Sequence, residues 1–211
     1  MVTPQGPGRL LIDAAADPRC TLVLGHGAGG GPNAGDLELL ARELPALGVT
    51  VVRFEQPWRT AGRRVAVEPA KLDEAWLAAL EALRQNATTA PLYVGGRSAG
   101  ARVACRTAND VGAAGVVCLA FPLHLPGRRE KSRLAELLAP AVDRLVLQGT
   151  RDAFGTADEI RAAVGGAAGI QLVGLPGADH GYRVAKDADF TAADLRTALV
   201  EATSSFLAQA T

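Results

Sequence analysis

The chain is poor in the residues that would indicate a disulfide scaffold, a metal centre or a nucleic-acid-binding surface. It has only three cysteines in 211 residues, and their spacing matches no metal-binding motif. We expect Cys20, Cys105 and Cys118 to be buried, reduced thiols. The 22 basic residues balance the 22 acidic ones, so there is no net charge to attract a nucleic acid. The sequence therefore predicts no metal, no other cofactor and no nucleic-acid partner.

Long hydrophobic segments are also lacking. The longest apolar run, residues 111–121, is about half of the roughly 20 residues that a membrane-spanning helix needs. Near the N-terminus, Asp13 and Asp17 interrupt the apolar residues, and no signal peptide is indicated. We therefore expect a cytoplasmic protein that is not attached to a membrane, with a single domain over residues 1–211. The sequence leaves the formation of a homo-oligomer open.

Short apolar segments alternate with stretches of helical periodicity along the whole chain. The expected strands are residues 9–13 at an edge, 21–25, 49–54, 92–95, 115–120, 144–148 and 170–175. The expected helices are residues 36–47, 69–84, 99–108, 133–138, 156–164 and 192–208. Continuous apolarity is typical of strands that are buried on both faces. The alternation predicts an α/β fold, a three-layer α/β/α sandwich with a mostly parallel sheet of about six or seven strands.

Serine and histidine are scarce, with four serines and three histidines in the chain. Loops that leave the carboxyl ends of parallel strands meet at one edge of the sheet, and Ser98 is the only serine in any of these loops. It lies in Gly96-Arg97-Ser98-Ala99-Gly100, which matches G-x-S-x-G between an expected strand and an expected helix. Such a turn exposes the serine hydroxyl at the edge of the sheet, which indicates a nucleophile.

A serine hydroxyl needs a base to take its proton, and His180 follows the last expected strand. Asp152 follows the strand before it and would orient the imidazole of His180. Asp179 is the competing acid, but a residue adjacent in the chain rarely turns back onto the ring. The order Ser98, Asp152, His180, with each residue after its own strand, predicts a catalytic triad.

The glycine-rich loop at residues 25–35 follows the first strand of the expected parallel sheet and offers backbone donors. The N–H groups of Ala28 and Ala99 are the predicted oxyanion hole. His26, inside this loop, either fixes the loop conformation or contacts the substrate. His124 lies between Pro122 and Pro126, where it could line the site as part of a rigid wall.

The same segments resemble the α/β-hydrolase superfamily, particularly small lidless hydrolases that are similar to dienelactone hydrolase. The resemblance runs through LGHGAGG, RFEQPWRTAGRR, GGRSAG, FPLHLPGRRE, QGTRDAFG and GADHGY. It implies the α/β-hydrolase fold without a cap domain, with Ser98 as nucleophile, Asp152 as acid and His180 as base. The expected function is a serine hydrolase that cleaves a small ester, thioester or lactone without a cofactor.

Two other functions fit parts of the sequence. Residues 25–30 also satisfy G-x-G-x-x-G, and Glu55 ends the next strand, as in dinucleotide-binding proteins. That fingerprint should open a helix at once, whereas residues 31–35 extend the loop, and it would leave Ser98 and His180 unexplained. The second alternative is a non-catalytic protein-interaction module on the same fold.

Basic residues in two of the edge loops raise the question of an anionic substrate. Arg63 and Arg64 follow the second strand of the expected parallel sheet, and another basic group, Arg128, Arg129 and Lys131, follows the fourth. Guanidinium groups bind carboxylate or phosphate in a bidentate manner, so we expect a small acyl substrate that could carry negative charge. Solvated surface charge and ion pairs with neighbouring glutamates are the alternative.

Overall fold

A computed structural model describes residues 1–85, 90–186 and 188–209. Its centre is a seven-stranded sheet with the strand order β3-β5-β4-β6-β7-β8-β9. The strands are β3 (Arg9–Asp13), β4 (Cys20–Gly25), β5 (Val49–Glu55), β6 (Leu92–Arg97), β7 (Gly115–Leu119), β8 (Arg144–Gly149) and β9 (Ile170–Leu175). All neighbours in the sheet are parallel apart from the edge strand β3, which pairs antiparallel with β5. This confirms the predicted mostly parallel sheet.

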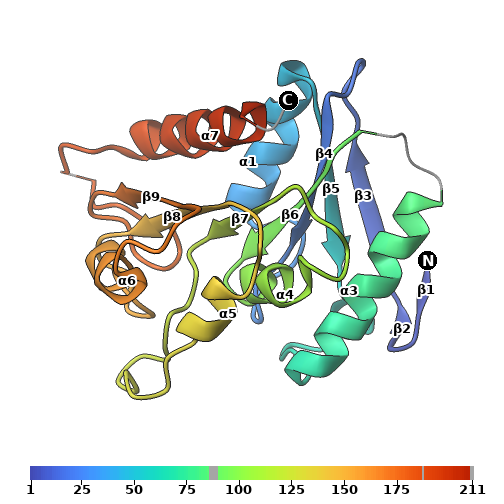
Figure 1. The fold of residues 1–211 in the computed structure, drawn as a ribbon, viewed down its shortest axis with the longest axis horizontal. Coiled ribbons are helices and arrows are strands. Elements are labelled where there is room, and N and C mark those ends of the chain that lie inside the picture. The colour runs from blue at the N-terminus through green and yellow to red at the C-terminus, as the bar shows by residue number, and fades with distance from the viewer. Residues whose placement is uncertain (86–89, 187, 210–211) are drawn as a thin grey trace.

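Helices cover both faces of the sheet (Figure 1). The helices are α1 (Gly35–Glu43), α2 (Pro57–Thr60), α3 (Pro69–Arg84), α4 (Ala99–Thr107), α5 (Leu134–Leu138), α6 (Ala157–Val164) and α7 (Ala192–Ala208). Helices α1 and α7 pack on one face, and α3, α4, α5 and α6 pack on the other. The three layers agree with the predicted sandwich.

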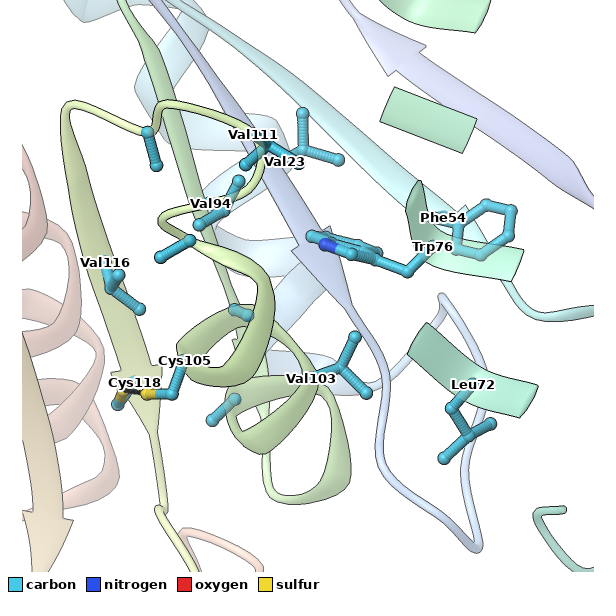
Figure 2. Close-up of a cluster of buried hydrophobic side chains, with 14 of the residues drawn as sticks. Val23, Phe54, Leu72, Trp76, Val94, Val103, Cys105, Val111, Val116 and Cys118 are labelled. Carbon is cyan, nitrogen blue, oxygen red and sulfur yellow. Dashed lines mark hydrogen bonds between the residues drawn. The ribbon is translucent and has the colours of Figure 1, made fainter. Parts of the chain in front are cut away.

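Alternate residues of the central strands supply two separate cores. In β4, Val23 faces the α3–α4 side, whereas Leu22 and Leu24 face α1 and α7. Figure 2 shows the first of these cores, in which Trp76 of α3 is completely buried beside the strands. Because both faces are covered, the strands carry almost no polar residue in their centres, which explains the continuous apolar segments in the sequence.

The structure differs from the sequence-based expectation in some local elements. The expected helix 36–47 ends as an α-helix at Glu43 and continues as a 3₁₀ helix, Leu44–Leu47, because Pro45 cannot donate a backbone hydrogen bond. The loop at 55–64 contains α2, which begins at Pro57. A small antiparallel pair, β1 (Val2–Thr3) and β2 (Gly6–Pro7), precedes the main sheet.

All three cysteines are buried and free, as expected. The Sγ atoms of Cys105 on α4 and Cys118 on β7 lie 3.5 Å apart in the core (Figure 2). Burial raises the pKa of the Cys20 thiol, and the contact with Cys118 together with burial raises the pKa of the Cys105 thiol. Among the described residues, no helix is both long and apolar enough to cross a membrane.

Candidate active site

Ser98 occupies a strained turn between β6 and α4. Its backbone has φ 52° and ψ −109°, a region that is costly for a residue with a side chain. The turn is supported by β4, because the backbone of Gly100 packs directly on the backbone of Gly25. A Cβ atom at Gly100 would lie 2.2 Å from the Gly25 carbonyl oxygen. The two glycines therefore allow the close approach that presents the Ser98 hydroxyl above the sheet edge.

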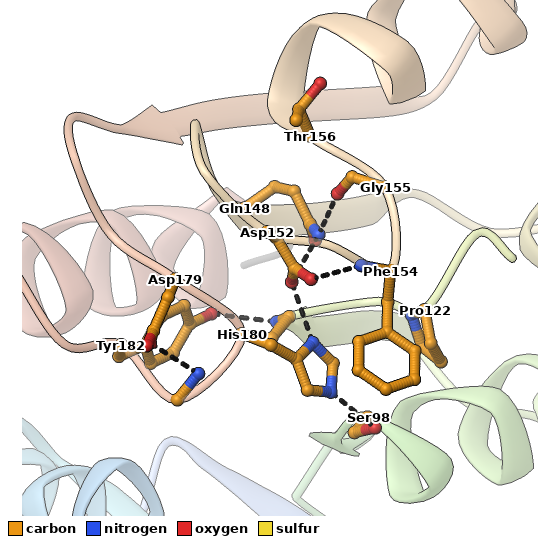
Figure 3. A network of polar contacts seen from close by, with 12 residues as sticks. Ser98, Pro122, Gln148, Asp152, Phe154, Gly155, Thr156, Asp179, His180 and Tyr182 are labelled. Atoms are coloured by element: carbon orange, nitrogen blue, oxygen red, sulfur yellow. Dashed lines mark hydrogen bonds and ion pairs between the residues drawn. The ribbon is translucent and has the colours of Figure 1, made fainter. Parts of the chain in front are cut away.

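Three side chains from three strand ends meet in one hydrogen-bonded chain (Figure 3). The Oγ atom of Ser98 lies 3.0 Å from Nε2 of His180, and Nδ1 of His180 lies 2.8 Å from Oδ2 of Asp152. The Asp152 side chain is completely buried, whereas about a fifth of the His180 side chain is exposed. A histidine held in this way can accept the serine proton on Nε2 while the carboxylate orients the ring and stabilises its charged form.

The Asp152 carboxylate has further partners that hold its orientation. Its Oδ2 atom accepts a hydrogen bond from Nε2 of Gln148 at 2.9 Å, and Oδ1 accepts from the backbone N–H of Phe154 at 2.8 Å. The ring of Phe154 stacks on the His180 imidazole with 4.1 Å between centroids (Figure 3). The loop after β8 thus positions both the acid and one face of the histidine.

The Asp179 carboxylate, the alternative acid in the sequence analysis, accepts hydrogen bonds within its own loop. Its Oδ1 atom accepts hydrogen bonds from the backbone N–H groups of Gly181 at 2.7 Å and Arg183 at 2.9 Å. It therefore stabilises the turn that carries His180, and the structure brings Asp152 to the ring in its place.

Arg97 is a residue of the site that the sequence reasoning missed. Its Nε atom lies 3.0 Å from Oδ2 of Asp36 on α1, and its Nη2 atom donates to the backbone carbonyl of His180. Its guanidinium also lies over the ring of Tyr182, 5.8 Å from the centroid. Burial raises the pKa of the Asp36 carboxyl, although the charge of Arg97 opposes that effect. No sequence pattern could have revealed these contacts, because they depend on where the long Arg97 side chain reaches and not on the topology of the strand ends.

Tyr182 fastens the end of the same loop to the sheet. Its hydroxyl donates to the carbonyl of Leu147 on β8 at 2.7 Å and accepts from the N–H of Ala120 after β7 at 2.8 Å. Burial raises the pKa of this phenol well above its ordinary value, so it stays protonated and can donate. Arg97 and Tyr182 together hold the loop at His180 and two residues after it.

The predicted oxyanion donors lie in the loop after β4, at Ala28, and at the start of α4, at Ala99. Within the described part of the chain, neither the N–H of Ala28 nor that of Ala99 donates to a protein acceptor. Ala99 is the first residue of α4, where free N–H groups point away from the helix. In the adjoining glycine loop, a Cβ atom built on Gly27 would lie 3.6 Å from Cβ of Ser98. Ala99 follows Ser98 in the chain and Ala28 follows Gly27, so both donors belong to residues next to this contact.

His26 lies beneath this loop and is held by backbone groups. Its Nδ1 atom lies 3.0 Å from the carbonyl oxygen of Gly27, and its Nε2 atom accepts from the N–H of Gln56 at 3.1 Å. Its ring packs edge-on against Trp58. Burial lowers the pKa of His26, which favours the neutral ring that these two contacts require. Of the two roles considered for His26, the contacts correspond to the loop-fixing one.

The remaining predicted substrate-binding residues lie apart from the triad. His124 is buried, with Nδ1 3.0 Å from the Leu125 carbonyl oxygen and Nε2 3.8 Å from Oε2 of Glu159. Arg63 and Arg64 are exposed in the loop after α2, and Arg63 borders a hollow beside Trp58. None of the three has a contact with Ser98 or His180 among the described residues.

The glycine loop does not have the course of a dinucleotide-binding loop. Residues 26–34 separate β4 from α1, so the helix begins several residues after the last glycine of the fingerprint. Glu55 forms an ion pair with Arg9 at 2.8 Å. Within residues 1–85, 90–186 and 188–209, no cluster of three or more histidine, cysteine or acidic residues could hold a metal ion.

Comparison with known proteins agrees with this architecture. A family profile described as an alpha/beta hydrolase domain matches residues 18–208. An alpha/beta serine hydrolase homologue from Coxiella burnetii is 21% identical with a TM-score of 0.77, covering 95% of this chain and 94% of that one. A serine hydrolase without a lid from Xanthomonas campestris is 23% identical with a TM-score of 0.72, covering 97% and 91%. Esterase 2 from Thermogutta terrifontis, phosphorylated by paraoxon, is 19% identical with a TM-score of 0.74, covering 99% and 91%.

Proposed function

This chain belongs to the alpha/beta hydrolase domain family, and we propose that it is a serine hydrolase that cleaves a small ester, thioester or lactone. The observation that carries the proposal is the chain of contacts from Ser98 Oγ to His180 Nε2 and from His180 Nδ1 to Asp152. The reaction proceeds through an acyl-enzyme on Ser98 and needs no cofactor. The substrate is a small molecule with an acyl group, and no nucleic acid or membrane takes part.

In the first half of the reaction, Ser98 Oγ attacks the acyl carbon while its proton passes to Nε2 of His180. Asp152 keeps Nδ1 protonated and stabilises the imidazolium that forms. The N–H groups of Ala28 and Ala99 stabilise the negative oxygen of the tetrahedral intermediate, each by about 3–4 kcal/mol of barrier. His180 then gives its proton to the leaving alcohol or thiol, and the acyl group remains on Ser98.

In the second half, water takes the place of the leaving group. His180 accepts a proton from the water molecule, whose oxygen attacks the acyl carbon, and the acid is released as the proton returns to Ser98. The partial exposure of the His180 side chain supports this step, because water can reach the ring without a lid having to open. The absence of a lid in the Xanthomonas campestris hydrolase is consistent with such an open site.

The proposal is tested by labelling with a fluorophosphonate probe, followed by mass spectrometry of the peptide that contains Ser98. We expect a single label on Ser98, no label in Ser98→Ala, and labelling at least ~100-fold slower in His180→Ala. Ser132→Ala, which alters an exposed serine in the loop before α5, is the matched control and should label like the wild type. Equal labelling of the wild type and His180→Ala, or no label on Ser98, would contradict the proposal and favour a non-catalytic interaction module.

A further inference from the structure

A narrow slot opens beside the two candidate oxyanion donors. It lies between the loop after β4, α2 and the facing sides of α3 and α4, and we call it the acyl slot. Its walls include Ala28, Ala99, Trp58, Leu72, Trp76 and Val103. In Figure 2, Leu72 and Trp76 on α3 and Val103 on α4 lie on opposite sides of the space between the two helices. Gly27, where an added Cβ would lie 3.6 Å from Cβ of Ser98, also borders the slot.

The lining of the slot suggests that the acyl chain of a substrate enters it. When the substrate oxygen accepts hydrogen bonds from Ala28 and Ala99, the acyl carbon lies between these donors and Ser98 Oγ. One of its two other substituents is the leaving group, which must face His180 to receive a proton. The other substituent, the acyl chain, is therefore directed away from His180. The acyl slot borders both donor residues, and His180 is not among its lining residues.

The free space in the slot is very small. Its volume is about 10 Å³, close to what one water-sized group needs. The walls are fixed parts of the core, because Trp76, Val103 and Leu72 are all buried. Such close-packed side chains do not move aside without cost, so the slot has room for about one methyl group.

Two polar side chains, Gln56 and Trp58, also border the slot. The Gln56 side chain is anchored by its Nε2 atom, which donates to the Leu72 carbonyl at 3.1 Å. Its Oε1 atom and the Nε1 atom of Trp58 are buried and have no hydrogen-bond partner among the described residues.

We propose that the acyl slot restricts the substrate to short, acetyl-sized acyl groups and that Leu72, Trp76 and Val103 set this limit. The inference rests on the proposed function, because it assigns the acyl side of the same reaction. It leaves the leaving group free to be large, since that group faces the open side of the site at His180.

The test compares kcat/KM for p-nitrophenyl acetate, butyrate, hexanoate and octanoate, which share one leaving group and differ only in the acyl chain. For the wild type we expect kcat/KM to fall at least ~10-fold from acetate to hexanoate. Leu72→Ala and Val103→Ala enlarge the slot and should raise the hexanoate-to-acetate ratio at least ~10-fold. Leu77→Ala on α3 and Val111→Ala after α4 are the matched controls, since neither residue borders the slot.

The ratio is read within each variant, so a variant that is partly unfolded still gives a valid result. Equal kcat/KM for acetate and octanoate in the wild type would overturn the inference. So would equal ratios in Leu72→Ala and Leu77→Ala, and in Val103→Ala and Val111→Ala. These outcomes leave the fluorophosphonate label on Ser98 in place. Absence of that label, together with no turnover of any ester, would instead overturn the proposed function.

Discussion

The guanidinium of Arg97 donates a hydrogen bond to the backbone carbonyl of His180, across a separation of 83 residues in the chain. Arg97 directly precedes Ser98, so one end of β6 supplies both the proposed nucleophile and a side chain that supports the loop of the proposed base, His180. This side chain is itself fixed by the ion pair between Arg97 and Asp36. The distance between Ser98 and His180 therefore depends on a side chain that touches neither of their reacting atoms.

Replacement of Arg97 should impair the reaction more than the binding of substrate. We expect Arg97→Met to lower kcat for p-nitrophenyl acetate about 10–100-fold with little change in KM, because a misplacement of about 1 Å at the base is enough for such a loss. Arg97→Lys keeps the charge beside Asp36 but not the fork geometry, and should lose less activity. Arg161→Met, which alters an exposed arginine of α6, is the control.

A purely structural role of Arg97 makes a different prediction. Arg97→Met leaves Asp36 buried and unpaired, which should cost about 3–5 kcal/mol of unfolding free energy. The double variant Arg97→Met/Asp36→Asn removes the charge and should recover much of that stability. If Arg97 positions His180, kcat stays low in the double variant. Recovery of kcat together with stability in urea titrations would contradict the positioning role.

The stability of the protein should depend on pH through His26. Burial lowers the pKa of His26 in the folded chain, whereas the unfolded chain binds a proton near the ordinary value of about 6.5. Below that pH the unfolded state binds more protons, so the free energy of unfolding falls as the pH is lowered, until the folded state also becomes protonated. His26→Leu should be less stable by about 1–3 kcal/mol at pH 7.5, because the N–H of Gln56 loses its acceptor.

The measurement for His26 is the free energy of unfolding in urea at several pH values between 5 and 7.5. As the pH falls over this interval, the wild type should lose more stability than His26→Leu. The slopes of unfolding free energy against pH should differ by the equivalent of up to about one bound proton. If the free energy of unfolding depends on pH in the same way in both proteins, protonation of His26 does not contribute to this pH dependence.

Gly100→Ala should be strongly destabilising. The added Cβ would lie 2.2 Å from the carbonyl oxygen of Gly25, a backbone atom at the end of β4 that cannot easily move aside. We expect a loss of about 3 kcal/mol or more in urea unfolding and a loss of esterase activity, because α4 must shift relative to β4. Gly35→Ala at the start of α1 is the matched control, since a Cβ there meets nothing within 4 Å. A loss below about 1 kcal/mol in Gly100→Ala would contradict this account.

The fold and the meeting of three side chains could be predicted because both follow from short-range patterns and topology. Continuous apolar strands indicate a parallel sheet, and a parallel sheet brings the loops after its strands to one edge. Ser98, Asp152 and His180 each follow such a strand, and the structure brings their side chains into hydrogen-bond contact. The G-x-S-x-G spacing reflects the close approach of Gly100 and Gly25, a local steric requirement that is visible in the sequence.

Contacts that depend on the reach of one side chain could not be predicted. Arg97 could have faced solvent, and only the packing of α1 beside the His180 loop brings Asp36 to it. His124 lies in a loop at the expected edge, but its ring faces Glu159 instead of His180. The helix α2 was missed although Pro57 stands at its first position, where proline is favoured. The acyl slot depends on how α3 packs against α4, which periodicity alone does not specify.

The three residues of the triad come from the ends of three different strands, and this arrangement ties activity to the order in which the chain folds. The contact of His180 with Ser98 spans 82 residues and that with Asp152 spans 28. Contacts between distant residues form late, because the loop that they close is costly in entropy. No partly assembled sheet that lacks β9 can contain His180 in place. The return of esterase activity during refolding should therefore lag behind the return of helical signal, because turnover also requires the contact between His180 and Ser98.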